Sequence, residues 1–170
     1  MICIDSFFFI LVRAPLIDLL QTNIKHSDID VGYNPHIQQT ELYRKVATSK
    51  FVFCPSGLGL DTYRLWESLI LGAIPIVESN PVGLDRTYGS LPVLVVENFA
   101  HVSEKLLHDA YSCFLQNARL YHFQHLSQGY WVDVIRRIQN TGSVDVYNLE
   151  HQAVNAYCNF MQNVSRVTLL

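Results

Sequence analysis

The chain has 170 residues, of which 49% are hydrophobic and 16% are charged, and this balance excludes an intrinsically disordered protein. Its formal net charge is −3 with no block of basic residues, so we expect no nucleic-acid partner. A chain of this length can bury a substantial core, and we expect an ordered globular domain.

Residues 1–37 precede the regular pattern of the central block, and we expect them to form a separate N-terminal segment. Within them the apolar run 7–12 (FFFILV) stops at Arg13 and Pro15. It is too short to span a bilayer, and it lacks the flanking signals of a secretory leader. A buried strand, or a chain start foreign to the rest of the fold, fits this run better.

The next elements follow from hydrophobic spacing and turn residues. We expect a short helix over 15–21, a loop over 22–37 with one edge strand near 29–31, a helix over 39–48, a strand over 50–54, a helix over 62–71 and strands over 74–77 and 93–96. Pro75 predicts a strand start or a special backbone, because proline cannot donate to a regular ladder.

The helix expected over 62–71 has clear signals at both ends. Asp61 can cap its start and Gly72 can end it. We expect one apolar face and an opposite polar face. The apolar face would hold Tyr63, Leu65, Trp66, Leu69 and Ile70, and the polar face Arg64, Glu67 and Ser68.

The rest of the chain reads as helical, over 102–116, 118–127, 130–139 and 149–164, with Gly129 and residues 140–142 between helices. The fold class is therefore α/β. We expect a Rossmann-like, mainly parallel sheet of three or four strands flanked by helices over residues 38–140, followed by a helical C-terminal tail over 141–170.

Cysteines and histidines give no metal pattern. Cys3, Cys54, Cys113 and Cys158 form no CxxC, and we expect free, partly buried thiols, with any pairing left open. Of the seven histidines only His122 and His125 share a helical face, without an acidic or cysteine neighbour at ligand spacing. We predict no metal site.

The glycine turn before the second helix suggests an anion site. Gly57 and Gly59 permit positive φ and close approach of a ligand to the backbone. The helix start at Asp61 adds unpaired N–H groups and the positive end of the helix dipole. Together these features favour a pyrophosphate site.

Arg64 and Glu67 sharpen this interpretation. A cation in the first turn of a helix opposes the dipole, which costs about 0.3–1 kcal/mol, and a bound anion would offset that cost. Alternatively, Arg64 forms a solvated ion pair with Glu67 or Asp61. Glu67 has three interpretations: it accepts from ribose hydroxyls, holds Arg64, or faces water.

Other side chains near this block have a structural and a ligand-binding interpretation. Trp66 and Tyr63 can stack on a base or sugar, although core packing is the favoured reading. Tyr88, in the turn-rich GLDRTYGSLP stretch, and Glu78 and Ser79, just after a strand, are candidates for lining a ligand cleft. For Glu78 and Ser79, ordinary loop polarity explains the residues equally well.

Gly57-x-Gly59 with Glu78 about twenty residues later partly matches the dinucleotide fingerprint. Thr62 replaces its third glycine, and Arg64 and Pro75 are untypical. A dinucleotide-dependent oxidoreductase is therefore the weakest of the functions considered.

Residues 49–77 (SKFVFCPSGLGLDTYRLWESLILGAIPIV) and then 91–96 (LPVLVV) resemble the exostosin-like glycosyltransferases, and are similar to the C-terminal domain of the ribitol-phosphate xylosyltransferase type. The matching positions are Gly57, Gly59, Asp61, Arg64, Trp66, Glu67, Gly72 and Pro75. Residues 126–132 (LSQGYWV) resemble a downstream Tyr-Trp stretch, so the likeness covers about 40–135. Leu58 and Ser56 depart from the pattern, where Asn and a second proline are common.

The resemblance implies the C-terminal, nucleotide-sugar-binding lobe of a two-lobed GT-B glycosyltransferase. By resemblance, Arg64 would face the donor phosphates and Glu67 the ribose or sugar, while Asp61 and the two glycines would shape the pocket. The donor would be a UDP-type nucleotide sugar, with no permanently bound cofactor, and the acceptor a glycan or glycoprotein. Catalytic residues are not assigned.

The resemblance also implies a Golgi lumenal location, with membrane-anchored full-length relatives. An acceptor lobe would come from a missing N-terminal part, of which residues 1–37 would be the remnant, or from a partner chain. We expect this chain to be a fragment of such an enzyme. A non-catalytic nucleotide- or carbohydrate-binding module is the alternative.

Overall fold

The computed structural model describes residues 2–5, 16, 24, 29–32, 37–57, 59–79 and 88–141. Within them, five strands form one sheet in the order β2-β1-β3-β4-β5, and every pairing is parallel. The strands are β1 (Ile2–Asp5), β2 (Ile29–Gly32), β3 (Phe51–Phe53), β4 (Ile74–Glu78) and β5 (Leu94–Val96). The predicted parallel α/β fold is confirmed, but the expected three or four strands were too few.

Two of these strands come from the N-terminal segment that the sequence sets apart. β1 pairs with both β2 and β3, so it lies inside the sheet, and β2 forms the edge predicted near 29–31. The segment 1–37 therefore contributes to the same sheet as the central block. The apolar run 7–12 lies outside the described residues, as does the predicted helix over 15–21 apart from Leu16.

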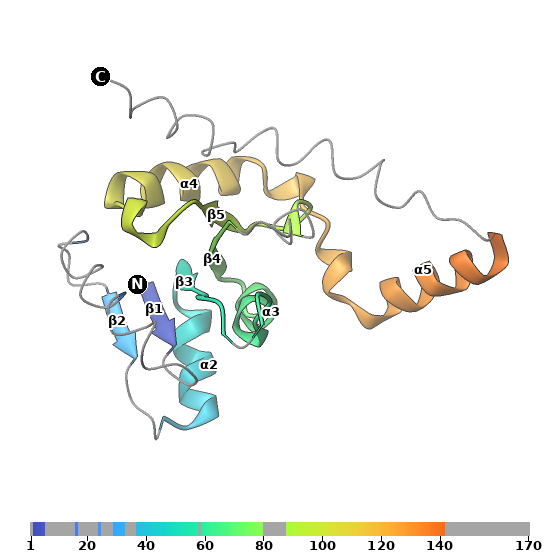
Figure 1. Cartoon of the computed structure of the whole chain (residues 1–170), viewed down its shortest axis with the longest axis horizontal. Coiled ribbons are helices and arrows are strands. Elements are labelled where there is room, and N and C mark those ends of the chain that lie inside the picture. The colour runs from blue at the N-terminus through green and yellow to red at the C-terminus, as the bar shows by residue number, and fades with distance from the viewer. Residues whose placement is uncertain are drawn as a thin grey trace.

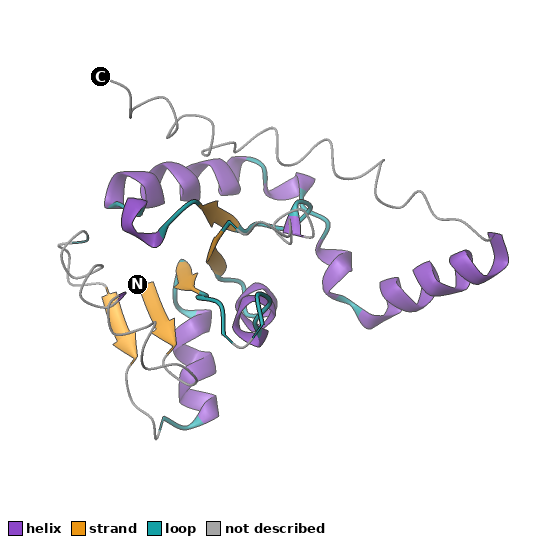
Figure 2. Cartoon of the chain, viewed as in Figure 1, coloured by secondary structure: helices purple, strands orange, loops and turns teal. Residues whose placement is uncertain are grey.

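Helices flank the sheet on both faces, as Figures 1 and 2 show. They are α2 (Gln39–Ala47) and α3 (Tyr63–Ile70) on one face and α4 (Glu104–Gln116) on the other, whereas α5 (Gln128–Thr141) extends away from the sheet. Three short 3-10 turns, η2 (Phe99–His101), η3 (Ala118–Leu120) and η4 (Phe123–Leu126), lie between β5 and α5. The helix expected over 118–127 forms two 3-10 turns instead, and Gly129 lies within α5 rather than before it. The predicted helix over 149–164 lies outside the described residues.

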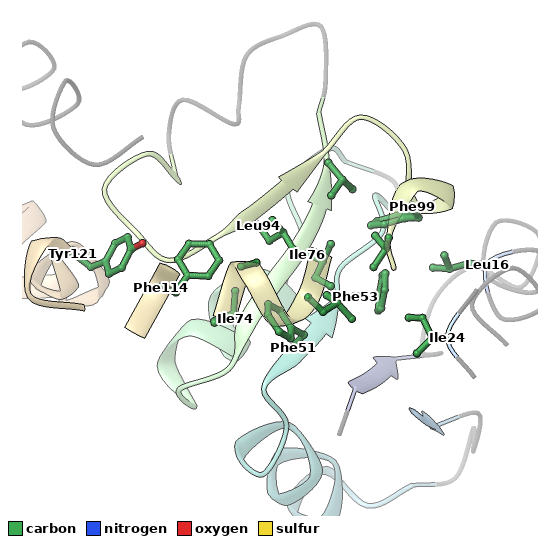
Figure 3. Packing of buried hydrophobic residues seen from close by; sticks show 14 residues of the cluster. Leu16, Ile24, Phe51, Phe53, Ile74, Ile76, Leu94, Phe99, Phe114 and Tyr121 are labelled. Carbon is green, nitrogen blue, oxygen red and sulfur yellow. The ribbon is translucent and has the colours of Figure 1, made fainter. Parts of the chain in front are cut away.

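Alternating side chains of the strands build two cores, one on each face of the sheet. Phe51 and Phe53 of β3 face α4, together with Ile74 and Ile76 of β4 (Figure 3). Val52 lies in the second cluster, beneath α2 and α3. Strands apolar on both faces are typical of parallel sheets covered by helices, so the sequence pattern and the layers agree.

Pro75 occupies the second position of β4, which agrees with a strand start. The Ile74 N–H donates to Lys50 O and Ile76 O accepts from the Cys54 N–H, so these flanking residues use their backbone groups toward β3. Pairing with β5 begins only at Ile76. Pro75 therefore lies where no neighbouring strand needs its missing N–H.

The buried face of α3 differs from the predicted one. Leu65, Ser68 and Leu69 are buried, whereas Tyr63 is 89% exposed and Ile70 66% exposed. The prediction was wrong for Tyr63 and Ile70, because residues seven apart share one side of a helix and this side lies roughly opposite Leu65. It was also wrong for Ser68, which was placed on the polar face but is buried, with its hydroxyl donating to Arg64 O at 2.6 Å. Tyr63 and Ile70 are the first and last residues of this eight-residue helix, and both side chains face away from the sheet.

Gly72 ends α3 as predicted, with φ +85°. The Gly72 N–H donates to Leu69 O and the Ala73 N–H to Ser68 O, which is the Schellman pattern of bonds. A Cβ at this position would meet no atom within 4 Å, so space does not require glycine. The backbone conformation does.

We expect Gly72→Ala to lower the free energy of unfolding by about 1–2 kcal/mol, because an L-residue is strained at this φ. Urea denaturation of both proteins measures the difference. Gly129→Ala, at another glycine with open space and no positive φ, is the control and should not destabilise the fold. Equal loss in both variants would contradict the assigned cause.

The described cysteines agree only in part with the sequence prediction of free thiols. Cys54 is a buried thiol near Val52 O and Ser68, as expected, whereas Cys113 is disulfide-bonded, so the expectation of free thiols was wrong there. Among the helices within the described ranges, none combines the length and the hydropathy that crossing a bilayer would require.

Candidate functional site

The sheet order places a ligand-binding position next to the glycine turn. The chain runs from β1 outward to β2 and then returns to β3 on the other side of β1, so the strand order reverses between β1 and β3. Ligands of open parallel α/β sheets bind at this reversal, beyond the carboxyl ends of the strands. Gly57 and Gly59 follow the carboxyl end of β3 and lead into α3.

Neither glycine of the turn has the backbone conformation that the sequence suggested. Among the described residues, only Gly72 has positive φ. An added Cβ would meet nothing within 4 Å at Gly57, and nothing closer than 3.5 Å at Gly59. The fold therefore gives no steric or conformational reason for glycine at these two positions. Close approach of a ligand is the remaining one of the two reasons proposed.

Asp61 does not cap α3. Thr62 occupies the N-cap position, without a side-chain capping bond, and the helix begins at Tyr63. The Asp61 carboxylate instead accepts hydrogen bonds from Trp66 Nε1, at 3.1 and 3.0 Å to its two oxygens, and from the Tyr88 hydroxyl at 3.2 Å. The two aromatic donors hold an exposed carboxylate beside the glycine turn.

Arg64 pairs with Glu67 on the next turn of α3, with 2.9 Å between Nη1 and Oε2. The side chains are only 13% and 31% exposed, so this is a shielded pair and not the solvated one considered as the alternative. The Arg64 Nη1 atom is buried. Its distance from Glu67 is that of an ion pair, but the angle between the two groups is not that of a hydrogen bond. Of the three interpretations of Glu67, holding Arg64 matches this geometry.

A neighbouring helix completes the arrangement around Glu67. The Tyr43 hydroxyl of α2 donates to Glu67 Oε1 at 2.9 Å and accepts from Gln39 Nε2 at 2.8 Å. The sequence predicted a helix over 39–48 but connected neither residue with the site. A tyrosine beside charged residues on a half-buried position was the available signal, since tyrosine hydroxyls seek partners when buried.

The three residues predicted to line a ligand cleft, Glu78, Ser79 and Tyr88, lie in different environments. Glu78 ends β4, and its Oε1 accepts from the Phe99 N–H at 2.9 Å, which joins β4 to the turn after β5. Ser79 is exposed and donates its N–H to Val96 O at 2.7 Å.

Tyr88 is not open in a loop, as its sequence context suggested, but 3% exposed in the core. Its ring packs edge-on against Trp66, with 5.8 Å between ring centroids. Trp66 is half-buried beside the same cluster, so core packing describes it, whereas Tyr63 is exposed. Tyr88 is therefore a buried residue whose hydroxyl holds the Asp61 carboxylate, and it does not line an open surface.

The Tyr-Trp stretch near residue 130 forms a separate cluster with His125. The His125 Nδ1 lies 2.6 Å from Ser90 Oγ, and Trp131 Nε1 donates to His125 O at 2.8 Å. The Tyr130 ring lies 4.4 Å from the His125 ring, centroid to centroid. These contacts fasten the start of α5 to the loop before β5. In the part of the chain that the structure covers, no three His, Cys, Asp or Glu side chains gather as a metal-binding group.

Gly57, Gly59, Asp61, Arg64 and Glu67 thus occupy one turn and the following two helical turns, while Glu78 bonds toward β5. The fold and this arrangement define a parallel α/β domain with a charged pair beside the glycine turn. Sequence comparison finds no matching protein-family model and no matching curated protein.

Proposed function

We propose that this domain binds the nucleotide-sugar donor of an exostosin-like glycosyltransferase, at the glycine turn and the start of α3. The donor would be a UDP-type nucleotide sugar, and the acceptor a hydroxyl of a glycan or glycoprotein. Gly57, Gly59, Asp61, Arg64 and Glu67 would form the donor site. The motif resemblance supports this assignment, and so does the position of the turn at the reversal of strand order.

The observation that carries the proposal is that two glycines, Gly57 and Gly59, which the fold itself does not require, stand just before a shielded cation, Arg64. The backbone conformation does not need glycine at position 57 or 59, whereas a diphosphate approaching the main chain would need it there. Arg64 stands in the first turn of α3, where a cation opposes the helix dipole, and the Glu67 carboxylate on the next turn offsets its charge. A diphosphate would explain the two glycines, with Arg64 as the nearby cation that binds it.

The proposed location is the Golgi lumen, as for the enzymes that the motif resembles. The disulfide at Cys113 suits an oxidising compartment of this kind. Transfer itself would also require an acceptor-binding lobe and a base near the acceptor hydroxyl.

The direct test is thermal protection of the full chain by UDP and UDP-sugars, measured by differential scanning fluorimetry over a concentration series. Binding to the folded state alone raises the melting temperature with ligand concentration. No shift with any nucleotide sugar would remove the proposal. Protection by NAD but not UDP would favour a dinucleotide enzyme, and sugar transfer or donor hydrolysis would separate an enzyme from a binding module.

Gly57→Ala provides a sharper version of this test. We expect unchanged stability without ligand, because the added methyl group meets nothing within 4 Å and φ is not positive. We expect UDP affinity about tenfold or more weaker, because the methyl group would occupy the space of an approaching phosphate. Titration calorimetry measures the affinity and urea denaturation the stability. Unchanged UDP affinity would show that this glycine does not contact the donor.

A further inference from the structure

Helix α2 lies beside α3 on the same face of the sheet, and its Val46 shares a core cluster with Leu65 of α3 (Figure 1). At the polar margin of this packing, Gln39, Tyr43, Glu67 and Arg64 form a chain of contacts from one helix to the other. We call these four residues the α2–α3 relay. Two of them belong to the candidate site, and two come from a helix that no sequence motif connects with it.

The hydrogen-bond directions in the relay follow from the groups themselves. The Gln39 amide donates to the Tyr43 oxygen, so the single hydroxyl proton of Tyr43 points to Glu67 Oε1. The other carboxylate oxygen, Oε2, lies 2.9 Å from Arg64 Nη1. Both oxygens of Glu67 are therefore engaged, one by a neutral donor and one by the cation.

An i,i+3 ion pair on a helix is weak when it stands alone, because two long side chains must lose rotamer freedom to form it. The Tyr43 hydroxyl of α2 lowers this cost for Glu67, since it also holds the carboxylate in one orientation. The 13% exposure of the Arg64 side chain also limits screening by water. The relay thus orients a positive charge at the start of α3.

We infer that Tyr43 and Gln39 are positioning residues of the proposed donor site, which hold Glu67 and through it Arg64, and so make the site selective for the phosphate groups of the ligand. This inference rests on the proposed function. It names the phosphates, and not the base or ribose, as the part of the ligand that the relay recognises. Glu67 accordingly orients Arg64 and does not have ribose binding as its main role.

The test compares UDP with uridine, which lacks both phosphates, on the full-length wild-type chain and on Tyr43→Phe. Ligand-detected NMR and titration calorimetry measure the two affinities. Tyr43→Phe keeps the ring and removes only the hydroxyl, so we expect UDP affinity about three- to tenfold weaker and uridine affinity unchanged. A merely structural effect would lower both affinities together.

Two further variants complete the experiment. In a Glu67→Gln background, Tyr43→Phe should no longer change UDP affinity, because the two groups act as one unit. Glu41→Gln on α2 removes an exposed ion pair with Arg44 outside the relay and should leave UDP affinity unchanged.

The outcomes separate the inference from the proposed function. If wild type binds UDP but Tyr43→Phe binds it equally well, or loses UDP and uridine affinity together, the relay has no role in phosphate recognition and the proposed function stands. If wild type does not bind UDP at all, the proposed function fails and the inference fails with it.

Discussion

Arg64→Ala is expected to weaken UDP binding by about ten- to a hundredfold, and to remove most of the thermal protection by UDP. The reason is the loss of a charge-assisted contact to phosphate, of about 1.5–3 kcal/mol, in a position where water screens it little. Arg64→Lys should fall between wild type and Arg64→Ala, because lysine keeps the charge without the planar fork of donors. Titration calorimetry measures all three affinities.

Arg64→Ala also leaves the Glu67 carboxylate without its cation, so the variant must first be compared with wild type without ligand. Its melting temperature and circular dichroism spectrum show whether the fold persists. Arg44→Ala is the matched control, because Arg44 is an exposed arginine paired with Glu41 at the same i,i+3 spacing. A folded Arg64→Ala protein with undiminished protection by UDP would exclude Arg64 from the donor site.

Leu65→Ala is expected to lower the free energy of unfolding by about 2–5 kcal/mol, the usual cost of emptying a buried leucine site. Leu65 is 1% exposed and lies between the sheet and α3, in the cluster that holds Val52, Val77 and Leu91. Since domains of this kind are stable by about 5–15 kcal/mol, the loss is a large part of the total. The midpoint of urea denaturation measures it.

Ile70→Ala, on the same helix, is the matched control for this effect. Ile70 is 66% exposed, so its truncation removes little buried surface, and alanine is the better helix former. We expect a change of about 0.5 kcal/mol or less. If Ile70→Ala were as costly as Leu65→Ala, the assignment of the inner face of α3 would be incorrect.

Local signals predicted well whatever depends on neighbouring residues in the chain. The helix over 39–48, the strands near residues 50 and 74 and the glycine stop after α3 all form close to the expected positions. Backbone geometry explains this success, because φ preferences, proline and the period of apolar residues act over a few residues. The strand Ile2–Asp5 was missed because it has only four residues and is followed closely by a stronger apolar run.

The candidate site was predicted in its members but not in its contacts. The sequence places Arg64 and Glu67 at i,i+3, and the ion pair between them follows from helix geometry. Asp61 was expected to cap a helix, and it binds two aromatic donors instead. One of these donors, Tyr88, lies twenty-seven residues further along the chain, which no local pattern can indicate.

By itself, the sequence determined a parallel α/β domain with a glycine turn, a cation and a carboxylate in successive positions around one helix start. These properties depend on spacing along the chain. Only the tertiary structure decided which helix face is inside, that Tyr88 is buried, and that Tyr43 of α2 reaches Glu67 of α3. Those contacts join residues far apart in sequence, and the packing of two helices on one sheet, not any local preference, brings them together.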